Sequence, residues 1–538
     1  MAQRKQRQGM TQRRSEANPS YTPTHSRSGA HLGTRLAAAL GGAAAVGIAS
    51  TAAHLIARSR KSTPTANAHK AARNATITGE SEKLFGVDDA MVQRLFAMMR
   101  IPTISGSDSP QKPFTDFEAY LHSAYPLVAA HLTRERPRAR RSLLYTWEGS
   151  NPQLRPLVLM AHYDVVDPGD PHDWGDGSHT AFEPYLDDDG VIHGRGCLDD
   201  KGCLLIIFEA VERLLSEGFT PERTVYIALG GNEETVGADG PNPIPALFAE
   251  RGIEPWMVLD EGGAVIDAPL PGIDKRLAVV GVSEKGVLTL RMTARSAGGH
   301  ASTPSKDSAI FVLAEALDAI STNTFPRRMP QPMRKMLTLL APYAPAHLRT
   351  ALSNIDVLSR PVAEALGRTD GELGASMHTT VAPTMLEGGT APNALPTEAS
   401  ATLNVRIALG ETIESTVTHL RRQVNNDRIS FEVIEGDDPS PISPIDNPQY
   451  DALTTAIKGS WPDALPVPYV MLACSDARFW HKHWPNVYRF CPMYMSAAQR
   501  KTIHGFGENL NASELERGTT FHMNLLRKVA RGSGKVGR

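Results

Sequence analysis

The 538-residue chain has almost no net charge, since 56 Lys and Arg residues balance 58 Asp and Glu residues. A formal charge of −2 supplies no extended basic surface, so the composition excludes a typical nucleic-acid-binding protein. Cysteine is also scarce, and the four residues at positions 197, 203, 474 and 491 form no C-x-x-C pair. This spacing argues against a cysteine zinc site or a disulfide scaffold, and it predicts buried free thiols. No internal repeat is present.

Charged residues are missing from one N-terminal run, Leu36 to Ala57. Residues 1–35 before it are basic, with Glu16 as their single acid, and residues 58–83 after it have the composition of a flexible linker. A helix of that length matches the roughly 30 Å hydrocarbon core of a bilayer. We therefore expect a single-span membrane anchor with the remaining chain on the non-cytoplasmic side, in a vacuole, a lumen or outside the cell. A cleaved secretory signal, which would give a secreted protein, and an organellar transit peptide are the alternatives.

Buried strands alternate with helices in residues 84–285. Three short apolar runs, 157–161, 224–229 and 256–259, are typical of strands in a parallel sheet, and residues 202–217 have a helical pattern. Residues 90–99 and 114–131 also have helical patterns. The alternation of strands and helices returns over residues 437–531, with a helix expected at 512–531. This alternation predicts an α/β domain that is split in the sequence.

The intervening residues 286–436 have a different pattern. Strands are expected at 287–294, 378–386, 399–407 and 429–434, with helices at 308–320 and 411–424. This β-α-β-β-α-β order is ferredoxin-like, so we expect an inserted α+β domain. Residues 326–374 are rich in Pro, Arg and Met and interrupt the pattern as a helical insertion.

Acidic residues and histidines follow the buried strands. His162 and Asp164 come directly after the first strand, where alternate side chains share a face, so the imidazole can bind a metal that the carboxylate supports. Glu233 and Glu234 follow the second strand at a glycine turn. One of them would bind metal and the other would act as general base. A solvated surface loop is the alternative for each pair.

Two further acidic segments and a late histidine complete a metal-binding set. Asp199 is the candidate bridge between two zinc ions, whereas Asp200 can equally cap the helix that follows. Glu261 follows the third strand, and His504 supplies a second imidazole from a glycine-rich loop. The carboxylates of Asp199, Glu234 and Glu261, with one hydroxide, balance the four positive charges of two Zn²⁺ ions, which allows burial.

Together these residues resemble the dinuclear zinc metallopeptidase family that includes aminoacylase, carboxypeptidase S, carnosinase and succinyl-diaminopimelate desuccinylase. The resemblance covers roughly residues 84–530 and is carried by six strings in family order. They are Met160-Ala-His-Tyr-Asp-Val-Val166, Gly194-Arg-Gly-Cys-Leu-Asp-Asp-Lys-Gly202, Gly231-Asn-Glu-Glu-Thr235, Leu259-Asp-Glu-Gly-Gly263, Ser296-Ala-Gly-Gly-His-Ala-Ser302 and Ile503-His-Gly505.

The resemblance implies a role for each of these residues. One metal would be held by His162, Asp199 and Glu261, and the other by Asp199, Glu234 and His504. Asp164 would support His162, Glu233 would be the general base, and a cis peptide would join Asp199 to Asp200. Asp260 remains a rival to Glu261, because the last ligand is Asp in some members of the family.

The resemblance also implies residues on the substrate side. His300 would stabilise the tetrahedral intermediate, sometimes from a partner subunit, and Asn393 and Arg406 would hold the substrate carboxylate. Arg478 is a weaker counterpart, since Ala473 and Cys474 replace the usual glycines before it. Cys197 stands where a smaller or hydroxyl residue is usual, and we assign it no role. The inserted domain would be a lid or dimerisation domain, and a homodimer is a further expectation.

The carboxypeptidase S and N-acyl-amino-acid hydrolase subfamilies fit best. The sequence therefore predicts hydrolysis of an amide bond next to a free carboxylate, in a peptide or an N-acyl amino acid, with two zinc ions per chain. A narrow dipeptidase or deacylase is one alternative. A membrane-tethered binding protein without catalytic activity is another. The sequence argues against it, because the candidate base and every candidate metal ligand are present.

Overall fold

The structure is a computed structural model, and it describes residues 88–530 apart from residues 107, 138–140, 175–178, 236–241 and 323–324. The basic segment 1–35, the expected anchor or signal 36–57 and the linker 58–83 lie outside the described residues. Within the described residues, no helix is long and apolar enough to cross a membrane. The membrane anchor therefore stays a prediction.

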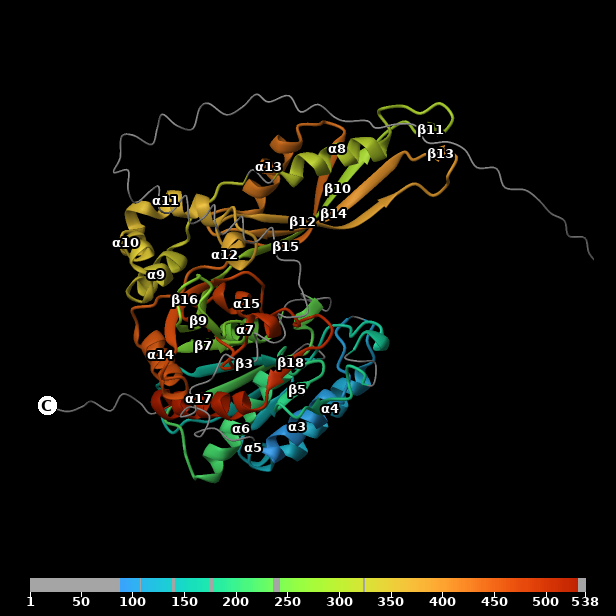
Figure 1. The fold of residues 1–538 in the computed structure, drawn as a ribbon. Coiled ribbons are helices and arrows are strands. Elements are labelled where there is room, and N and C mark those ends of the chain that lie inside the picture. Colours follow the sequence, from blue (N-terminus) through green and yellow to red (C-terminus); the bar gives the residue numbers. More distant parts are fainter. Residues whose placement is uncertain are drawn as a thin grey trace, which may run out of the picture.

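A mixed sheet forms the centre of the larger domain, and it has nine strands in the part of the chain that is described (Figure 1). The order is β1-β2-β6-β3-β7-β17-β9-β16, and β8 pairs with β9. The neighbours β6, β3, β7 and β17 run parallel to one another, so their carboxyl ends lie at one edge of the sheet. The strands are β1 Thr133–Glu135, β2 Leu143–Trp147, β3 Leu157–His162, β6 Val225–Gly230, β7 Met257–Asp260, β8 Val265–Asp267, β9 Arg276–Glu284, β16 Leu465–Met471 and β17 Val487–Arg489.

Helices cover both faces of this sheet. Alternate side chains along a strand point to opposite faces, and here they enter two separate cores. In β3, Leu157 and Leu159 join the large core, whereas Val158 belongs to a smaller core on the other face. The large core includes residues of α3 Asp89–Met99, α4 Gln111–Ala124, α5 Pro126–His131, α6 Lys201–Ser216, α14 Pro448–Ser460 and α17 Ser513–Val529, and the small one residues of α7 Ile244–Arg251 and α15 Ala477–His481. The expected α/β/α domain is confirmed.

One predicted helix is divided. Residues 114–131 were expected to form a single helix, but the chain has α4 and α5 with Tyr125 between them in a non-helical conformation. Pro126 occupies the first position of α5, and a proline disfavours the helical conformation in the residue before it. The prediction of a continuous helix here is wrong for that reason.

A disulfide links Cys203, in the first turn of α6, to Cys491, just after β17. The prediction of four free thiols is therefore wrong for these two, while Cys197 and Cys474 are free. The 288 residues that separate the pair in sequence hid the bridge, because only the fold brings α6 and β17 together.

This disulfide should contribute measurably to stability. A bond that closes so long a loop restricts the unfolded chain, and its loss typically costs about 2–5 kcal/mol. We expect replacement of Cys203 and Cys491 by alanine to lower the free energy of unfolding by that amount in urea titrations. Reductant should destabilise the wild type and leave the double variant unchanged. A wild type indifferent to reductant would contradict the prediction.

The smaller domain contains a four-stranded antiparallel sheet in the order β12-β14-β10-β15. Its strands and helices follow the predicted β-α-β-β-α-β order: β10 Gly286–Arg295, α8 Ala309–Ser321, β12 Thr380–Gly388, β14 Glu398–Ile407, α13 Ile413–Val424 and β15 Ile429–Asp437. One face of the sheet packs on α8 and α13. A short two-stranded sheet of β11 Gly299–His300 and β13 Ala394–Leu395 lies at the end of this domain away from the larger one (Figure 1).

The helical insertion packs on the larger domain. It comprises α9 Gln331–Leu340, η4 Ala341–Tyr343, α10 Ala346–Ser353, α11 Ile355–Leu366 and α12 Glu372–Ala375. Met333, Met336 and Leu337 of α9 belong to the large core together with Val467 of β16. The insertion thus extends the larger domain at the β16 edge of its sheet.

Candidate metal centre

The predicted metal ligands lie around one edge of the central sheet. His162 is the last residue of β3, Glu233 and Glu234 begin the 3-10 helix η3 Glu233–Thr235 just after β6, and Glu261 follows β7. These three strands are neighbours and parallel, so all four side chains start from their carboxyl ends. Ligand sites in α/β proteins are usually found at this edge.

Asp199 lies between two histidines. Its Oδ1 is 2.9 Å from Nε2 of His162, and its Oδ2 is 3.0 Å from Nε2 of His504. Burial opposes ionisation of Asp199, but the hydrogen bonds to both histidines outweigh it, so its pKa is lowered. A carboxylate that turns one oxygen to each of two imidazoles has the arrangement of a bridging ligand.

His504 also contacts a second carboxylate, since its Nε2 is 2.9 Å from Oε2 of Glu234. Hydrogen bonds to Asp199 and Glu234 raise the pKa of His504 to about 10. The His504 backbone has a φ of 61°, a left-handed conformation that is uncommon outside glycine and costs of the order of 1 kcal/mol. About half of its side chain is exposed, so this part of the cluster opens to solvent.

The other nitrogen of His162 faces Asp164. Nδ1 lies 3.1 Å from the Asp164 carbonyl oxygen and 3.4 Å from its Oδ1, and the Asp164 side chain is fully buried. The Asp164 carboxylate also accepts a hydrogen bond from the backbone N–H of Glu234. Asp164 therefore orients His162 with Nε2 toward Asp199, as supporting carboxylates do at metal sites.

Asp200 lies behind this cluster. It is joined to Asp199 by a cis peptide bond, as the resemblance implies, and its carboxylate accepts a hydrogen bond from the backbone N–H of His162. It makes no side-chain capping bond to α6, although it stands at the N-cap. The capping alternative for Asp200 is therefore wrong, because its side chain is engaged by β3.

Asp260 and Glu261 face different surroundings. Asp260 is buried and accepts a hydrogen bond from the backbone N–H of Ala477, at the start of α15. Burial raises the pKa of Glu261, and so do the nearby charges of Asp199 and Asp200. The hydrogen bond of Asp260 thus ties β7 to the start of α15, and Glu261 stays the predicted ligand.

Glu233 has a different environment from Glu234. Burial raises its pKa strongly, with a further contribution from the charge of Asp476 that exceeds that of Glu234. The negative charge of Glu233 is also one of the charges that raise the pKa of Arg478. Glu233 begins η3 directly before Glu234, at the same edge of the sheet as the histidine–carboxylate cluster.

The donor set fits zinc. Ligand atoms that share a tetrahedral zinc ion at about 2.0–2.2 Å lie roughly 3.3 Å apart. The three histidine–carboxylate distances of 2.9, 3.0 and 2.9 Å are close to that spacing. His162, Asp199 and Glu234 bring ligand atoms within 4.8 Å of one another, so the cluster is compact enough for a metal.

A second group with compatible spacing is Asp200, Cys203 and Cys491. The two cysteines form the disulfide and so offer no thiolate. This group is therefore not a metal site in the folded protein.

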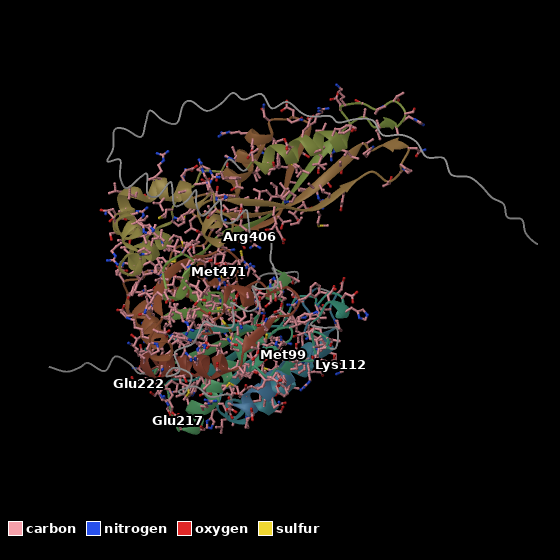
Figure 2. The ribbon with its side chains drawn as sticks, in the orientation of Figure 1. Met99, Lys112, Glu217, Glu222, Arg406 and Met471 are labelled. Atoms are coloured by element: carbon pink, nitrogen blue, oxygen red, sulfur yellow. A yellow bond between two sulfur atoms is a disulfide. The ribbon has the colours of Figure 1, made fainter. Side chains whose placement is uncertain are left out.

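Two of the expected substrate residues lie where the smaller domain meets the loop before α15. Nη1 of Arg406, on β14, is 3.3 Å from Sγ of Cys474. Arg406 lies at the junction between the two domains (Figure 2). Arg478 is buried, and among the described residues nothing accepts a hydrogen bond from its Nη2. A buried guanidinium with an unused donor is suited to an anionic ligand.

The other two substrate residues are not brought to the cluster within one chain. His300 ends β11 and Asn393 directly precedes β13 in the small two-stranded sheet, where the Ala301 N–H donates to the Asn393 carbonyl oxygen. Both residues are exposed, and strands β11 and β13 lie at the end of the smaller domain away from the larger one (Figure 1). Their proposed contacts with substrate would require a second subunit or movement of this domain.

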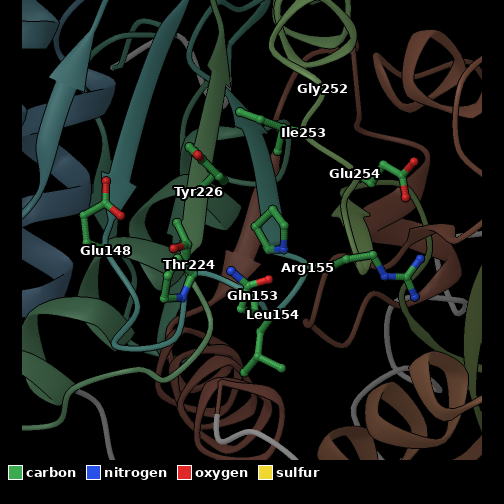
Figure 3. A pocket seen from close by; sticks show the side chains of 11 residues that line it. Glu148, Gln153, Leu154, Arg155, Thr224, Tyr226, Gly252, Ile253 and Glu254 are labelled. Atoms are coloured by element: carbon green, nitrogen blue, oxygen red, sulfur yellow. The ribbon is translucent and has the colours of Figure 1, made fainter.

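Two surface pockets lie elsewhere. A cavity of about 450 Å³ is lined by residues preceding β3, β6 and β7, including Arg155, Thr224 and Glu254 (Figure 3). It opens at the opposite edge of the sheet from the metal ligands. Another of about 570 Å³ lies between α12 and α16 Ala497–Arg500. Neither contains a residue predicted for the site.

Glu508 is a further residue of the centre that the sequence pattern did not reveal. Its buried carboxylate accepts a hydrogen bond from the N–H of Asp199 and pairs with Arg195. The segment after His504 contains this acid, but no local pattern marks it as buried, since its partners are about 310 residues away in sequence. The sequence analysis therefore missed it.

Comparison with known proteins identifies the family. Residues 158–528 match Peptidase family M20/M25/M40. The chain belongs to this family. It is 32% identical over 454 residues to the probable carboxypeptidase S-like 2 of Dictyostelium discoideum, covering 82% of this chain and 85% of that one. It is 31% identical over 449 residues to the human N-fatty-acyl-amino acid synthase/hydrolase PM20D1, covering 82% and 88%.

The fold has counterparts among solved structures of the M20 family. The M20 family metallo-carboxypeptidase Sso-CP2 from Sulfolobus solfataricus superposes with a TM-score of 0.60 at 14% identity, covering 82% of this chain and 99% of the other. The predicted family and fold class are thus confirmed, and the relatives support a hydrolase.

Proposed function

We propose that the protein is a dinuclear zinc hydrolase that cleaves the amide bond next to a free carboxylate in a peptide or an N-acyl amino acid. The observation that carries this proposal is Asp199, whose two oxygens each face one histidine. One zinc would be held by His162, Asp199 and Glu261, and the other by Asp199, Glu234 and His504. When bound, the pair would polarise the amide carbonyl and activate a water.

Glu233 would move the proton in this reaction. It would take a proton from the attacking water and later give it to the leaving nitrogen, which needs a carboxylate near the cluster but outside it. Its position directly before Glu234, after strand β6 and beside the end of β3, supports this role. Asp164 would keep His162 in the orientation that the first metal requires.

The substrate carboxylate would bind Arg406 and Arg478. Both guanidinium groups approach Cys474, since Arg406 contacts its Sγ and both charges lower its pKa against the effect of burial. Bidentate guanidinium binding explains why a free carboxylate would be required.

The requirement for a carboxylate is directly testable. An N-acyl phenylalanine and its C-terminal amide present the same scissile bond, but only the first has the charge. We expect turnover of the acid to exceed that of the amide by about 10-fold or more, from the 1.5–3 kcal/mol of a hydrogen bond to a charged group. Equal turnover of the two would refute this part of the proposal, and a parallel panel of blocked and free dipeptides would separate carboxypeptidase, dipeptidase and acylase activities.

Replacing Arg478 by methionine should weaken substrate binding. We expect KM for the acid to rise about 10- to 100-fold, from the loss of one charge-assisted contact, with a much smaller change for the amide. Lys482→Met is a matched control, because Lys482 also pairs with Asp437 but is exposed. An equal loss on acid and amide would show that Arg478 acts only on the fold.

A homodimer through the smaller domain is part of the proposal. Ile310 and Phe311 of α8 and Met385 and Leu386 of the edge strand β12 are exposed apolar residues. Such an edge is commonly covered by another chain. A second copy would also offer a source for His300 and Asn393 at the cluster. Sedimentation of the wild type and of Leu386→Glu should give a dimer and a monomer, and a monomeric wild type would refute it.

We propose that the catalytic domain lies on the non-cytoplasmic side of a membrane, anchored by residues 36–57. The basic residues before this run and the disulfide Cys203–Cys491 support this location, since disulfides persist in oxidising compartments. Protease protection of the intact membrane fraction tests it. Cleavage of the domain without detergent on the cytoplasmic side would contradict it.

A further inference from the structure

We propose that Glu508 is a positioning residue that holds together the two loops supplying Asp199 and His504, and that it governs the metal position of His504 more than the other position. This inference rests on the proposed dinuclear site. It concerns a residue that would touch neither metal nor substrate.

The Glu508 carboxylate is fully buried and accepts four hydrogen bonds. Oε1 accepts from the backbone N–H groups of Leu198 at 2.7 Å and Asp199 at 3.1 Å. Oε2 accepts from the N–H of Gly196 and from Nη1 of Arg195, both at 3.0 Å. A single side chain thus fixes the backbone of the loop that ends in the bridging aspartate.

The same ion pair reaches the loop of His504. Nη2 of Arg195 donates to the carbonyl oxygen of Gly505 at 3.1 Å, next to His504 in its left-handed conformation. The Gly194 N–H donates to the Glu508 carbonyl oxygen. The Arg195–Glu508 pair is therefore tied to both loops, and it offsets the cost of the strained backbone at His504.

The loop of Asp199 packs closely on α6, since a Cβ added at Gly202 would lie 2.1 Å from the Cys197 carbonyl oxygen. Asp199 itself contacts His504 at 3.0 Å, so a shift of this loop would disturb that contact.

The two metal positions depend on Glu508 unequally. The position of His504 draws two of its three ligands, Asp199 and His504, from the loops that Glu508 joins. The other position draws only Asp199 from them, because His162 ends β3 and Glu261 follows β7. Loss of Glu508 should therefore release one zinc preferentially.

Glutamine is the informative replacement. Glu508→Gln keeps the shape but puts an amide NH₂ opposite backbone N–H donors and removes the charge that pairs with Arg195. Glu514→Gln is the matched control, since Glu514 is also buried, pairs with Arg517 and accepts from the Tyr494 N–H, but contacts no predicted ligand. Both variants lose one buried carboxylate–arginine pair.

The experiment measures zinc per chain against a graded zinc chelator for the wild type, both variants and His504→Ala. We expect two zinc ions in the wild type and in Glu514→Gln. For Glu508→Gln we expect one zinc weakened by about 10- to 100-fold, as for other residues that orient metal ligands. The zinc ion that remains in Glu508→Gln should bind as tightly as the one that remains in His504→Ala. The double variant Glu508→Gln/His504→Ala should bind that ion no more weakly.

The outcomes separate this inference from the proposed function. A wild type that binds no zinc pair would sink the proposed function. A wild type with two ions and a Glu508→Gln variant that keeps both, or loses both equally, would overturn the inference alone, and so would equal zinc loss in Glu514→Gln. If Glu508→Gln does not fold, Arg195→Lys, which removes the bond to Gly505, should show the same selective loss.

Discussion

Glu233→Gln should lower kcat by about 10²- to 10⁴-fold while the protein keeps its zinc, because a positioned general base typically contributes that factor. Glutamine has nearly the shape of glutamate but cannot accept the proton of the attacking water. KM should change little, since the substrate contacts proposed for Arg406 and Arg478 are untouched. Steady-state kinetics together with elemental analysis of the same sample measures both quantities.

Glu222→Gln is a suitable control for this variant, since Glu222 is exposed before β6 and distant from the ligands in the fold. It should retain wild-type turnover. Loss of zinc together with activity in Glu233→Gln would make Glu233 a ligand, and the roles of Glu233 and Glu234 would then have to be exchanged.

Asp199→Asn should abolish binding of both zinc ions. Asp199 contacts both histidines, and its negative charge would offset the repulsion between two cations about 3.5–4 Å apart. We expect zinc affinity to fall by more than about 100-fold at both positions, beyond the 10- to 100-fold effect of residues that only orient ligands. Turnover should fall to background.

The selectivity of this loss distinguishes a bridge from a single ligand. Asp189→Asn, an exposed substitution in the turn between β4 Tyr185–Leu186 and β5 Val191–His193, should keep both ions. If Asp199→Asn kept one zinc at wild-type affinity, Asp199 would serve only one metal, and the bridging assignment would be incorrect.

The layers and the position of the centre could be predicted because they depend on local patterns. Strands β3 and β7 are apolar up to their last residues, His162 and Asp260, and β6 is followed within four residues by Glu233 and Glu234. Such apolar runs indicate burial on both faces of the sheet. Parallel neighbours necessarily bring such ends together. Asp199 and His504 follow none of these strands, and they were predicted because a pair of zinc ions needs a bridging carboxylate and a second imidazole.

What could not be predicted depends on contacts between distant segments. The disulfide of Cys203 and Cys491 and the buried pair of Arg195 and Glu508 each join residues about 300 positions apart. No periodicity in the sequence encodes such a contact. The hydrogen bond from the backbone N–H of Ala477 to Asp260 likewise joins segments that are distant in the sequence.

The most direct test of the central claim is zinc content and turnover measured on one preparation of the full chain. A blocked dipeptide and a long-chain N-acyl amino acid serve as parallel substrates. The proposed centre predicts about two zinc ions per chain, activity on at least one substrate, and loss of that activity on chelation with recovery on adding zinc. Failure to bind zinc even after reconstitution, or turnover unaffected by chelation, would contradict it.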